Sequence, residues 1–214
     1  QERLLCDALI GEPFYYRMQS LVLYQAMNFW YLRRLFDPVL KPGARVLPRR
    51  AAICVAGIEL LDLALSHGPV GSVLGFDHAP YDKRVRPRWH ELLYPYPLRA
   101  YKHRLLTDTH NLLWLDYTAL PTDVEATVTV PPTASGTLHA VAIWVDYEMI
   151  EGGPTRTTFG VDPQKVGGDT IGVACSGGSE GAGAGGKHEA GHEKQMVRFL
   201  AKPVVVDVGR EETG

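Results

Sequence analysis

Cysteine, long apolar runs and an excess of charge of either sign are all scarce in this chain. The 214 residues include only three cysteines, Cys6, Cys54 and Cys175, which are widely spaced and form no CxxC pair. This pattern argues against a disulfide framework and against a zinc knuckle, and it favours a reducing compartment. No apolar run approaches the roughly 18 residues of a membrane span, so we expect no membrane segment.

The charge balance also excludes a class of protein. The formal net charge is -2 and the isoelectric point is about 6.5, which argues against a basic protein that coats nucleic acid. A hydrophobic fraction of 45% is typical of a globular protein, and the length suits one large core or two small ones. We see no signal peptide, because Gln1–Leu9 already carries three charged residues.

The first forty residues predict a strand, a loop and a helix. Leu4–Ile10 is predicted as a short buried strand, and Met18–Phe36 as a helix that ends at Asp37-Pro38. The apolar residues near helical spacing are Leu21, Met27, Tyr31 and Leu35. Glu12 comes just after the strand, beyond Gly11, and open α/β sheets place their ligands at this end of a strand, although a turn or helix-entry carboxylate explains it equally well.

The pattern changes to short strands after a turn predicted at residues 41–43. These strands are rich in Val, Ile, Leu and aromatic residues and are bounded by Pro, Gly or Asp. The predicted strands are Ala44–Leu47, Ala51–Ile58, Ser72–Phe76, Asn111–Asp116, Glu125–Val130, Leu138–Glu148, Met196–Leu200 and Val204–Val208. Many short strands at this spacing favour a β-barrel or a β-sandwich, so the expected fold is mainly β with an N-terminal helix.

Two inserts interrupt the predicted strands. Residues 77–104 mix arginine and lysine with tyrosine, and four prolines exclude a continuous helix. This stretch suits binding of RNA or of an acidic partner, but we favour an exposed arm whose aromatic residues pack on a neighbour. The second insert, residues 164–190, contains the low-complexity run 177–186 and is expected to be flexible.

Three further features are candidates for chemistry. His188-Glu-Ala-Gly-His192 matches the H-E-x-x-H pattern of zinc hydrolases, but its glycine-rich context favours a chance match. Cys54 lies in an apolar strand and is expected to be buried and inert. Asp146 is expected on the solvated face of a strand rather than as a catalytic acid.

The order of several motifs resembles the protein arginine methyltransferase family, most closely the C-terminal module of its two-module type III members of the plant type. The matching segments are Gly11-Glu-Pro-Phe-Tyr-Tyr16, Asn28-Phe-Trp30, Lys41-Pro-Gly-Ala-Arg-Val-Leu-Pro48, Gly75-Phe-Asp77, His139–Tyr147, Gly191-His-Glu-Lys-Gln195 and Leu200-Ala-Lys-Pro203. The resemblance covers nearly the whole chain. It implies the end of a Rossmann-like, S-adenosylmethionine-binding domain over residues 1–43, followed by a β-barrel substrate domain over residues 44–214.

The resemblance also assigns site residues. Glu12 occupies the position of the first acid of the family's double-glutamate loop, and His192 that of the histidine in its substrate-side loop. Gln19 stands where the second glutamate is expected, and Glu193 replaces the loop's tryptophan. Because glutamine cannot neutralise a guanidinium, this module is expected to be degenerate. The predicted catalytic positions are therefore Glu12, Gln19 and His192, with no cofactor-binding or metal residues.

The implied parent transfers a methyl group from S-adenosylmethionine to protein arginine, and type III members make monomethylarginine. This chain alone is expected to bind no cofactor and to act as a pseudo-dimer partner through the arm at residues 77–104. The expected partners are the N-terminal methyltransferase module or a second copy, together with arginine-containing substrates, in the cytoplasm and nucleus. The alternatives are a zinc hydrolase that uses His188, Glu189 and His192, and a non-catalytic interaction module.

Overall fold

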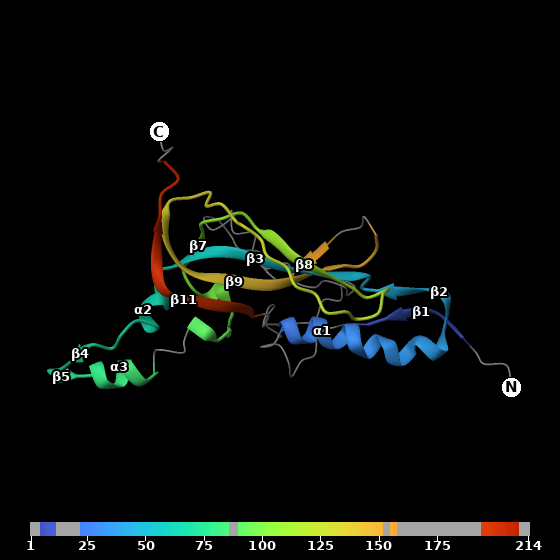
Figure 1. Cartoon of the computed structure of the whole chain (residues 1–214), viewed down its shortest axis with the longest axis horizontal. Helices are drawn as coiled ribbons and strands as arrows, with labels where there is room; N and C mark the ends of the chain where they lie inside the picture. Colours follow the sequence, from blue (N-terminus) through green and yellow to red (C-terminus); the bar gives the residue numbers. More distant parts are fainter. Residues whose placement is uncertain (1–4, 12–21, 86–89, 152–154, 158–193, 210–214) are drawn as a thin grey trace, which may run out of the picture.

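The computed structural model describes residues 5–11, 22–85, 90–151, 155–157 and 194–209 (Figure 1). The chain forms, in order, β1 (Cys6–Ile10), α1 (Val22–Arg33), the 3-10 helix η2 (Arg34–Val39), β2 (Leu40–Leu47), β3 (Arg50–Leu60), α2 (Leu63–Ser66), β4 (Ser72–Val73), β5 (Phe76–Asp77), α3 (Ala79–Val85), β6 (Tyr94–Tyr96), the 3-10 helix η4 (Leu98–Ala100), β7 (His103–Leu105), β8 (His110–Asp116), β9 (Gly136–Glu148), β10 (Thr155–Thr157) and β11 (Gln195–Val206). The fold is therefore mainly β with a few helices. No helix in the described residues is long and apolar enough to cross a membrane.

The centre of the molecule is the long antiparallel pair β3 and β9, which runs along the long axis in Figure 1. The outer edge of β3 pairs with β8 and then with β7. The outer edge of β9 pairs with β11 and with β10, and β11 pairs in turn with β6. These seven antiparallel strands form the main sheet.

A second, smaller sheet has parallel instead of antiparallel strands. β1 and β2 run parallel and are joined through α1, so the three elements form a β-α-β unit. The predicted turn at residues 41–43 lies inside β2, where Gly43 has a φ of 76° and the pairing with β1 shifts register. The prediction of a buried strand at the N-terminus is half right: β1 is a strand, but four of its five residues are exposed.

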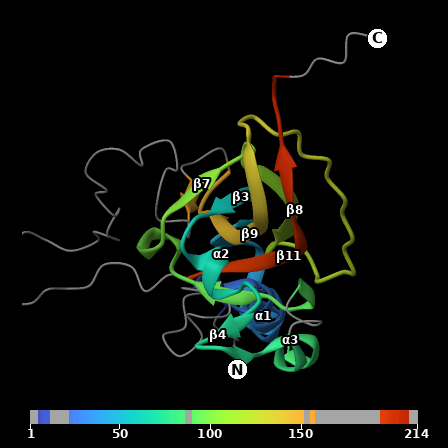
Figure 2. The ribbon, with the colours of Figure 1, turned by 90° about the vertical axis from the view of Figure 1, so that its left-hand side faces the viewer.

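Two apolar cores occupy opposite faces of the β3–β9 pair, because successive side chains of a strand alternate between faces. One core contains the even-numbered residues Ala52 to Leu60 of β3 with Trp144, Val197 and Phe199. The other contains Ala51, Val145 and Tyr147 and is completed by α1. Figure 2 shows α1 lying beneath the sheet, viewed nearly along its axis.

The helical spacing predicted the wrong buried face of α1. Met27 and Tyr31 of α1 and Leu35 of η2 are exposed, and Leu21 lies outside the described residues. The buried residues are Val22, Gln25, Ala26, Phe29, Trp30 and Arg33. The helix also changes from α to 3-10 at Arg34 and passes through Pro38, so Asp37-Pro38 does not mark its end.

The face of the first core also corrects the expectation for Asp146. This residue pairs with Ala52 and lies on the face of β9 that carries Trp144, so it is half-buried toward the interior instead of facing solvent. Cys54, in contrast, is fully buried as predicted.

Four of the predicted strands have a different form. Glu125–Val130 is not a strand, and the neighbouring contact is a single bridge between Thr107 and Pro132. Two consecutive prolines follow at Pro131 and Pro132, and a proline has no N–H to donate to a ladder. Ser72–Phe76 is instead the tight β4–β5 hairpin. The two strands predicted after residue 195 form one strand, β11, with an irregularity between Phe199 and Val204.

The stretch 77–104, expected as one exposed arm, divides into two parts. β6 and β7 belong to the main sheet, and Tyr94, Tyr96 and Tyr101 pack against its first core. Residues 70–85, which comprise β4, β5 and α3, stand away from the sheet at the end opposite β1 and β2 (Figure 1). We call residues 70–85 the projecting unit.

Candidate functional site

The three catalytic positions predicted from sequence, Glu12, Gln19 and His192, lie outside the described residues, as does the His188–His192 motif. The described residues nevertheless fix the places where both segments join the fold. Residues 12–21 connect Gly11 to α1, and residues 158–193 lead to β11. The positions of Gly11, the start of α1 and the start of β11 therefore show where the two predicted site segments are attached.

Gly11, the residue before Glu12, is held on two sides. Its backbone N–H donates to the carbonyl of Leu47 at 2.8 Å, which extends the β1–β2 pairing. A Cβ atom at this position would lie 2.2 Å from Cε2 of Phe29, far inside van der Waals contact. Only glycine allows this approach of the backbone to the ring. The start of the acid-bearing segment is thus fixed against both β2 and α1.

The ring of Phe29 is held in turn by the main sheet. It packs edge-on against Tyr117 with a centroid distance of 4.8 Å. Tyr117 is fully buried just after β8, and its hydroxyl donates to the carbonyl of Ala26 at 3.1 Å. Gly11, Phe29 and Tyr117 therefore form a continuous contact from the segment that carries Glu12 to the main sheet.

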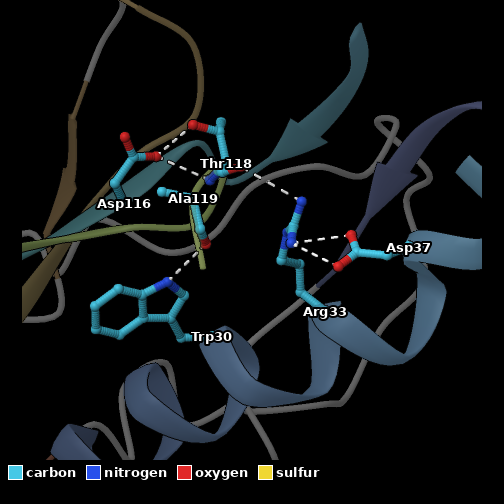
Figure 3. A network of polar contacts seen from close by, with 6 residues as sticks. All are labelled: Trp30, Arg33, Asp37, Asp116, Thr118 and Ala119. Carbon is cyan, nitrogen blue, oxygen red and sulfur yellow. Dashed lines mark hydrogen bonds and ion pairs between the residues drawn. The ribbon is translucent and has the colours of Figure 1, made fainter. Parts of the chain in front are cut away.

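Polar contacts attach the rest of α1 to the turn after β8 (Figure 3). Trp30 donates from Nε1 to the carbonyl of Ala119 at 3.1 Å. Arg33 donates to the carbonyl of Thr118 at 3.4 Å and forms an ion pair with Asp37 at 3.0 Å. These contacts set the position of the helix along its axis as well as its distance from the sheet.

The turn itself is fixed by Asp116, whose Oδ1 accepts from the backbone N–H and the hydroxyl of Thr118 at 2.8 and 2.6 Å. Burial alone raises the pKa of Asp116. The two hydrogen bonds from Thr118, with Arg49 and Arg50 nearby, outweigh that effect and lower the pKa. The carboxylate therefore remains charged and holds the turn that receives α1.

The segment that carries His192 is fixed where it enters β11. Gln195 is buried, and its Oε1 accepts from the backbone N–H of Leu98 at 3.0 Å. The same residue pairs with Tyr96 of β6. The start of β11 lies near the start of α1 in Figure 1, and the end-on view in Figure 2 keeps the two elements close. The two segments predicted to carry the site are therefore attached to the fold close to one another.

The described part of the chain provides neither a reactive thiol at Cys54 nor a metal-binding cluster for this site. Burial, with the charge of Asp146 nearby, raises the pKa of the Cys54 thiol far above its usual range. Its Sγ donates to Oδ1 of Asn111 at 3.2 Å, so it is an inert core thiol as predicted. The described residues contain no group of three or more His, Cys, Asp or Glu side chains placed to hold a metal ion.

Sequence reasoning missed the residues that position the site. Tyr117 lies outside every segment that the sequence analysis identifies, and Gly11 and Trp30 enter it only as parts of motifs. The available signal was the glycine that directly follows an apolar strand, since such a residue often marks a close backbone approach. The partners of Gly11 and Tyr117 are far from them in sequence, so no local pattern could identify them.

Comparison with known proteins finds relatives from different organisms that carry the same protein name. Protein arginine N-methyltransferase 7 of Danio rerio is 31% identical over 153 residues, which are 68% of this chain and 22% of that protein. The enzyme of the same name from Mus musculus is 30% identical over 150 residues, covering 66% of this chain and 21% of that protein. The Oryza sativa subsp. japonica protein of that name is 24% identical over 211 residues, covering 95% and 26%.

The chain thus spans about a fifth to a quarter of the length of these relatives. No profile of a known protein family matches it.

A solved structure shares the fold. The Trypanosoma brucei PRMT1 enzyme-prozyme heterotetrameric complex with AdoHcy contains a chain that matches with a TM-score of 0.54 and 16% identity. The match covers 95% of the present chain and 55% of that one. At this identity the match supports the fold alone, and the sequence relatives supply the family. Together they show that this chain belongs to the protein arginine N-methyltransferase family.

Proposed function

We propose that this chain is part of a protein arginine N-methyltransferase, made of the end of its methyltransferase domain (residues 1–43) and its β-barrel substrate domain (residues 44–214). The observation that carries the proposal is the junction between two kinds of sheet. The parallel unit β1-α1-β2 leads directly into an antiparallel sheet, and Glu12 follows the carboxyl end of β1. Ligands of parallel α/β sheets bind at that end of the strands.

The exposure of β1 supports the assignment of residues 1–43. Parallel sheets are normally covered on both faces, and two strands alone make a marginal sheet. β1 nevertheless leaves four of five residues exposed. We infer that β1 pairs with further strands of a Rossmann-like sheet in the parent protein. The exposed Tyr24, Met27 and Tyr31 of α1 are consistent with further covering of this region.

The proposed parent reaction joins a methyl group to an arginine nitrogen. The sulfonium–methyl bond of S-adenosylmethionine breaks, a nitrogen–methyl bond forms, and the guanidinium nitrogen loses a proton. The described part of residues 1–43 holds only Gly11 and Gly43, and no glycine-rich turn between strand and helix that suits the cofactor. We therefore place cofactor binding in the remainder of the parent protein.

The role proposed for this module is structural. A guanidinium keeps its charge at any physiological pH, and a neutral Gln19 in place of a second acid leaves Glu12 as a single counter-charge. The module would then support a catalytic partner module, in the manner of a pseudo-dimer. By family, the parent would produce monomethylarginine and act in the cytoplasm and nucleus.

The projecting unit is the surface through which we propose that the partner module is held. Val73, Leu74, Phe76 and Tyr81 are all exposed on it. Leu74 is 94% exposed and has a φ of 51°, which is uncommon for a residue other than glycine. A strained, solvent-exposed leucine at a hairpin tip is the arrangement expected of a contact residue. We therefore propose residues 70–85 as the arm, in place of the residues 77–104 proposed from the sequence.

Calorimetry and methylation assays test the proposal together. We expect these 214 residues alone to show no binding of S-adenosylmethionine and no methylation of an arginine peptide. The complete parent protein is expected to methylate the same peptide and to yield monomethylarginine by mass spectrometry. Micromolar cofactor binding by the 214 residues would contradict the structural role, and dimethylarginine from the parent would contradict the assigned product.

A further inference from the structure

A histidine enclosed by aromatic rings lies just before the projecting unit in the chain. His67 follows α2 directly and lies three residues before the unit begins. Its ring stacks on Phe199 of β11 with a centroid distance of 4.1 Å and an interplanar angle of 16°. Tyr94 and Tyr96 of β6 meet it edge-on at 5.8 and 5.5 Å. One side chain thus contacts two strands of the main sheet.

The hydrogen bonds of His67 define its protonation. Its Nδ1 lies 3.1 Å from the carbonyl of Leu63, and a carbonyl can only accept, so Nδ1 carries a hydrogen. Nε2 lies 2.7 Å from the hydroxyl of Tyr96. In the neutral ring Nε2 has a free lone pair and accepts from that hydroxyl. The neutral Nδ1–H tautomer therefore satisfies both of these partners at once.

The surroundings favour this neutral form. Burial lowers the pKa of His67 and outweighs the opposing effect of the Leu63 carbonyl. The described groups that face the ring include Ser66 from α2, whose Oγ is 3.0 Å from Nδ1, the two tyrosines of β6, and Phe199 of β11. Burial also raises the pKa of Tyr96, so its hydroxyl stays protonated near neutral pH.

The segment after His67 is tied to the projecting unit. The backbone N–H groups of Val70 and Gly71 donate to the two carboxylate oxygens of Asp82 in α3, each at 3.0 Å. His78 donates from its backbone N–H to the carbonyl of Gly71 at 2.8 Å. Movement at residues 67–71 would therefore carry the hairpin and α3 with it.

We propose that His67 is a pH-sensitive contact, which we call the pin. While its ring is neutral, the contact holds residues 67–71 on the main sheet. When the ring takes up a proton, the contact opens and these residues are released. Protonation places a charge between the rings and obliges Nε2 to donate, so the Tyr96 hydroxyl must reverse its hydrogen bond. The pinned state thus disfavours the proton, whereas an opened His67 in water accepts it at its ordinary pKa of about 6.5. The inference does not depend on any catalytic activity.

The direction of the pH effect follows from this difference. Because the pinned state has the lower pKa, its stability is fully present above about pH 6.5 and is lost as the pH falls through the pinned-state value. Between those two values one proton is taken up on opening. The opening equilibrium constant therefore rises about tenfold for each pH unit lost.

Hydrogen–deuterium exchange on the complete parent protein tests the pin. Backbone exchange in residues 63–73, corrected for intrinsic rates, is expected to report more opening as the pH falls from 7.5 to 5.0. Exchange at the imidazole C2 position gives the pKa of His67 directly. We expect a value below 6.5, and a value at or above 6.5 would overturn the proposal.

Three variants identify the residue responsible. His67→Gln keeps a polar side chain that does not titrate, so the pH dependence of opening in residues 63–73 is expected to vanish. Tyr96→Phe removes the hydroxyl that donates to neutral Nε2, so the pKa of His67 in the pinned state should rise toward 6.5 and the pH dependence of opening should weaken. His78→Gln changes a histidine inside the unit and serves as the matched control, with the wild-type pH profile retained.

Several results would contradict the pin. Opening that is independent of pH in the wild type, or equally dependent on pH in His67→Gln, would remove it. If His67→Gln proves unstable, the wild-type exchange profile and the C2 measurement still decide the question. Neither readout uses methylation or association, so failure of the proposed function would leave this result unaffected.

Discussion

α1 and the projecting unit both lie outside the main sheet and both carry apolar side chains, but they are held in different ways. α1 buries Phe29 and Trp30 against the sheet and adds hydrogen bonds from Trp30 and Arg33 to the turn after β8. The projecting unit leaves Leu74 and Phe76 exposed, and the hydrogen bonds from Val70 and Gly71 to Asp82 lie within the unit. α1 is therefore held by contacts within its own chain, whereas the projecting unit keeps apolar side chains available for contact with another molecule.

The largest effect on stability is expected at the best-anchored point of α1. Trp30→Ala removes a buried indole and leaves the carbonyl of Ala119 without its donor. We expect a loss of about 3–5 kcal/mol in the free energy of unfolding, measured by urea denaturation. The neighbouring exposed Tyr31 provides the control, because Tyr31→Ala should change stability by less than about 0.5 kcal/mol. Similar losses in both variants would mean that α1 is not anchored as described.

A smaller effect is expected from a single hydroxyl between the sheet and α1. Tyr117→Phe keeps the ring packed against Phe29 but removes the hydrogen bond to Ala26. The expected loss is about 1 kcal/mol, the net contribution of one buried hydrogen bond. Tyr81→Phe, on the exposed surface of α3, should leave the urea midpoint unchanged. A Tyr117→Phe variant as stable as the wild type would show that the packing alone holds the helix.

The smallest effect on stability is expected at the tip of the projecting unit, together with a large effect on association. Leu74→Asn removes an exposed apolar side chain and places a residue that tolerates positive φ better than leucine. The free energy of unfolding should change by less than about 0.5 kcal/mol. Association with the partner module, measured by analytical ultracentrifugation of separately produced modules, should weaken at least tenfold.

Leu65→Asn tests whether this loss of association depends on position. Leu65 is also a strongly exposed leucine, 80% accessible, but it belongs to α2 and not to the projecting unit. We expect its substitution to leave association intact. An equal loss in both variants would indicate a general effect of surface hydrophobicity, and no loss in Leu74→Asn would exclude the hairpin tip from the contact.

Sequence patterns predicted the long central strands well. Ala51–Ile58 and Leu138–Glu148 lie within or coincide with β3 and β9, because strong β-propensity and burial coincide in both. Glu125–Val130 has the same alternating composition and forms no strand. No described strand pairs with this segment, and Pro131 and Pro132 directly after it have no N–H to donate to a ladder, so its composition alone does not make it a strand.

The candidate site was predictable only in part, for a similar reason. The motif order that includes Glu12 led to the correct family, and it also led to specific residues that lie outside the described structure. The contacts that attach the site join residues distant in sequence, as between Trp30 and Ala119, which are 89 positions apart. Helical spacing alone selected Met27 and Tyr31 as core residues, whereas the position of the sheet selects Phe29 and Trp30.

The pairing of β3 with β9 has a consequence for the order of events during synthesis. Arg50 of β3 bonds to Glu148 of β9, which is 98 residues later in the chain. At translation rates of about 5–20 residues per second, β3 is synthesised roughly 5–20 seconds before its central partner. Among the described strands made in that interval, the shorter β7 and β8 are the ones that pair with β3. Nascent chains stalled between residues 60 and 136 should therefore depend most strongly on chaperones.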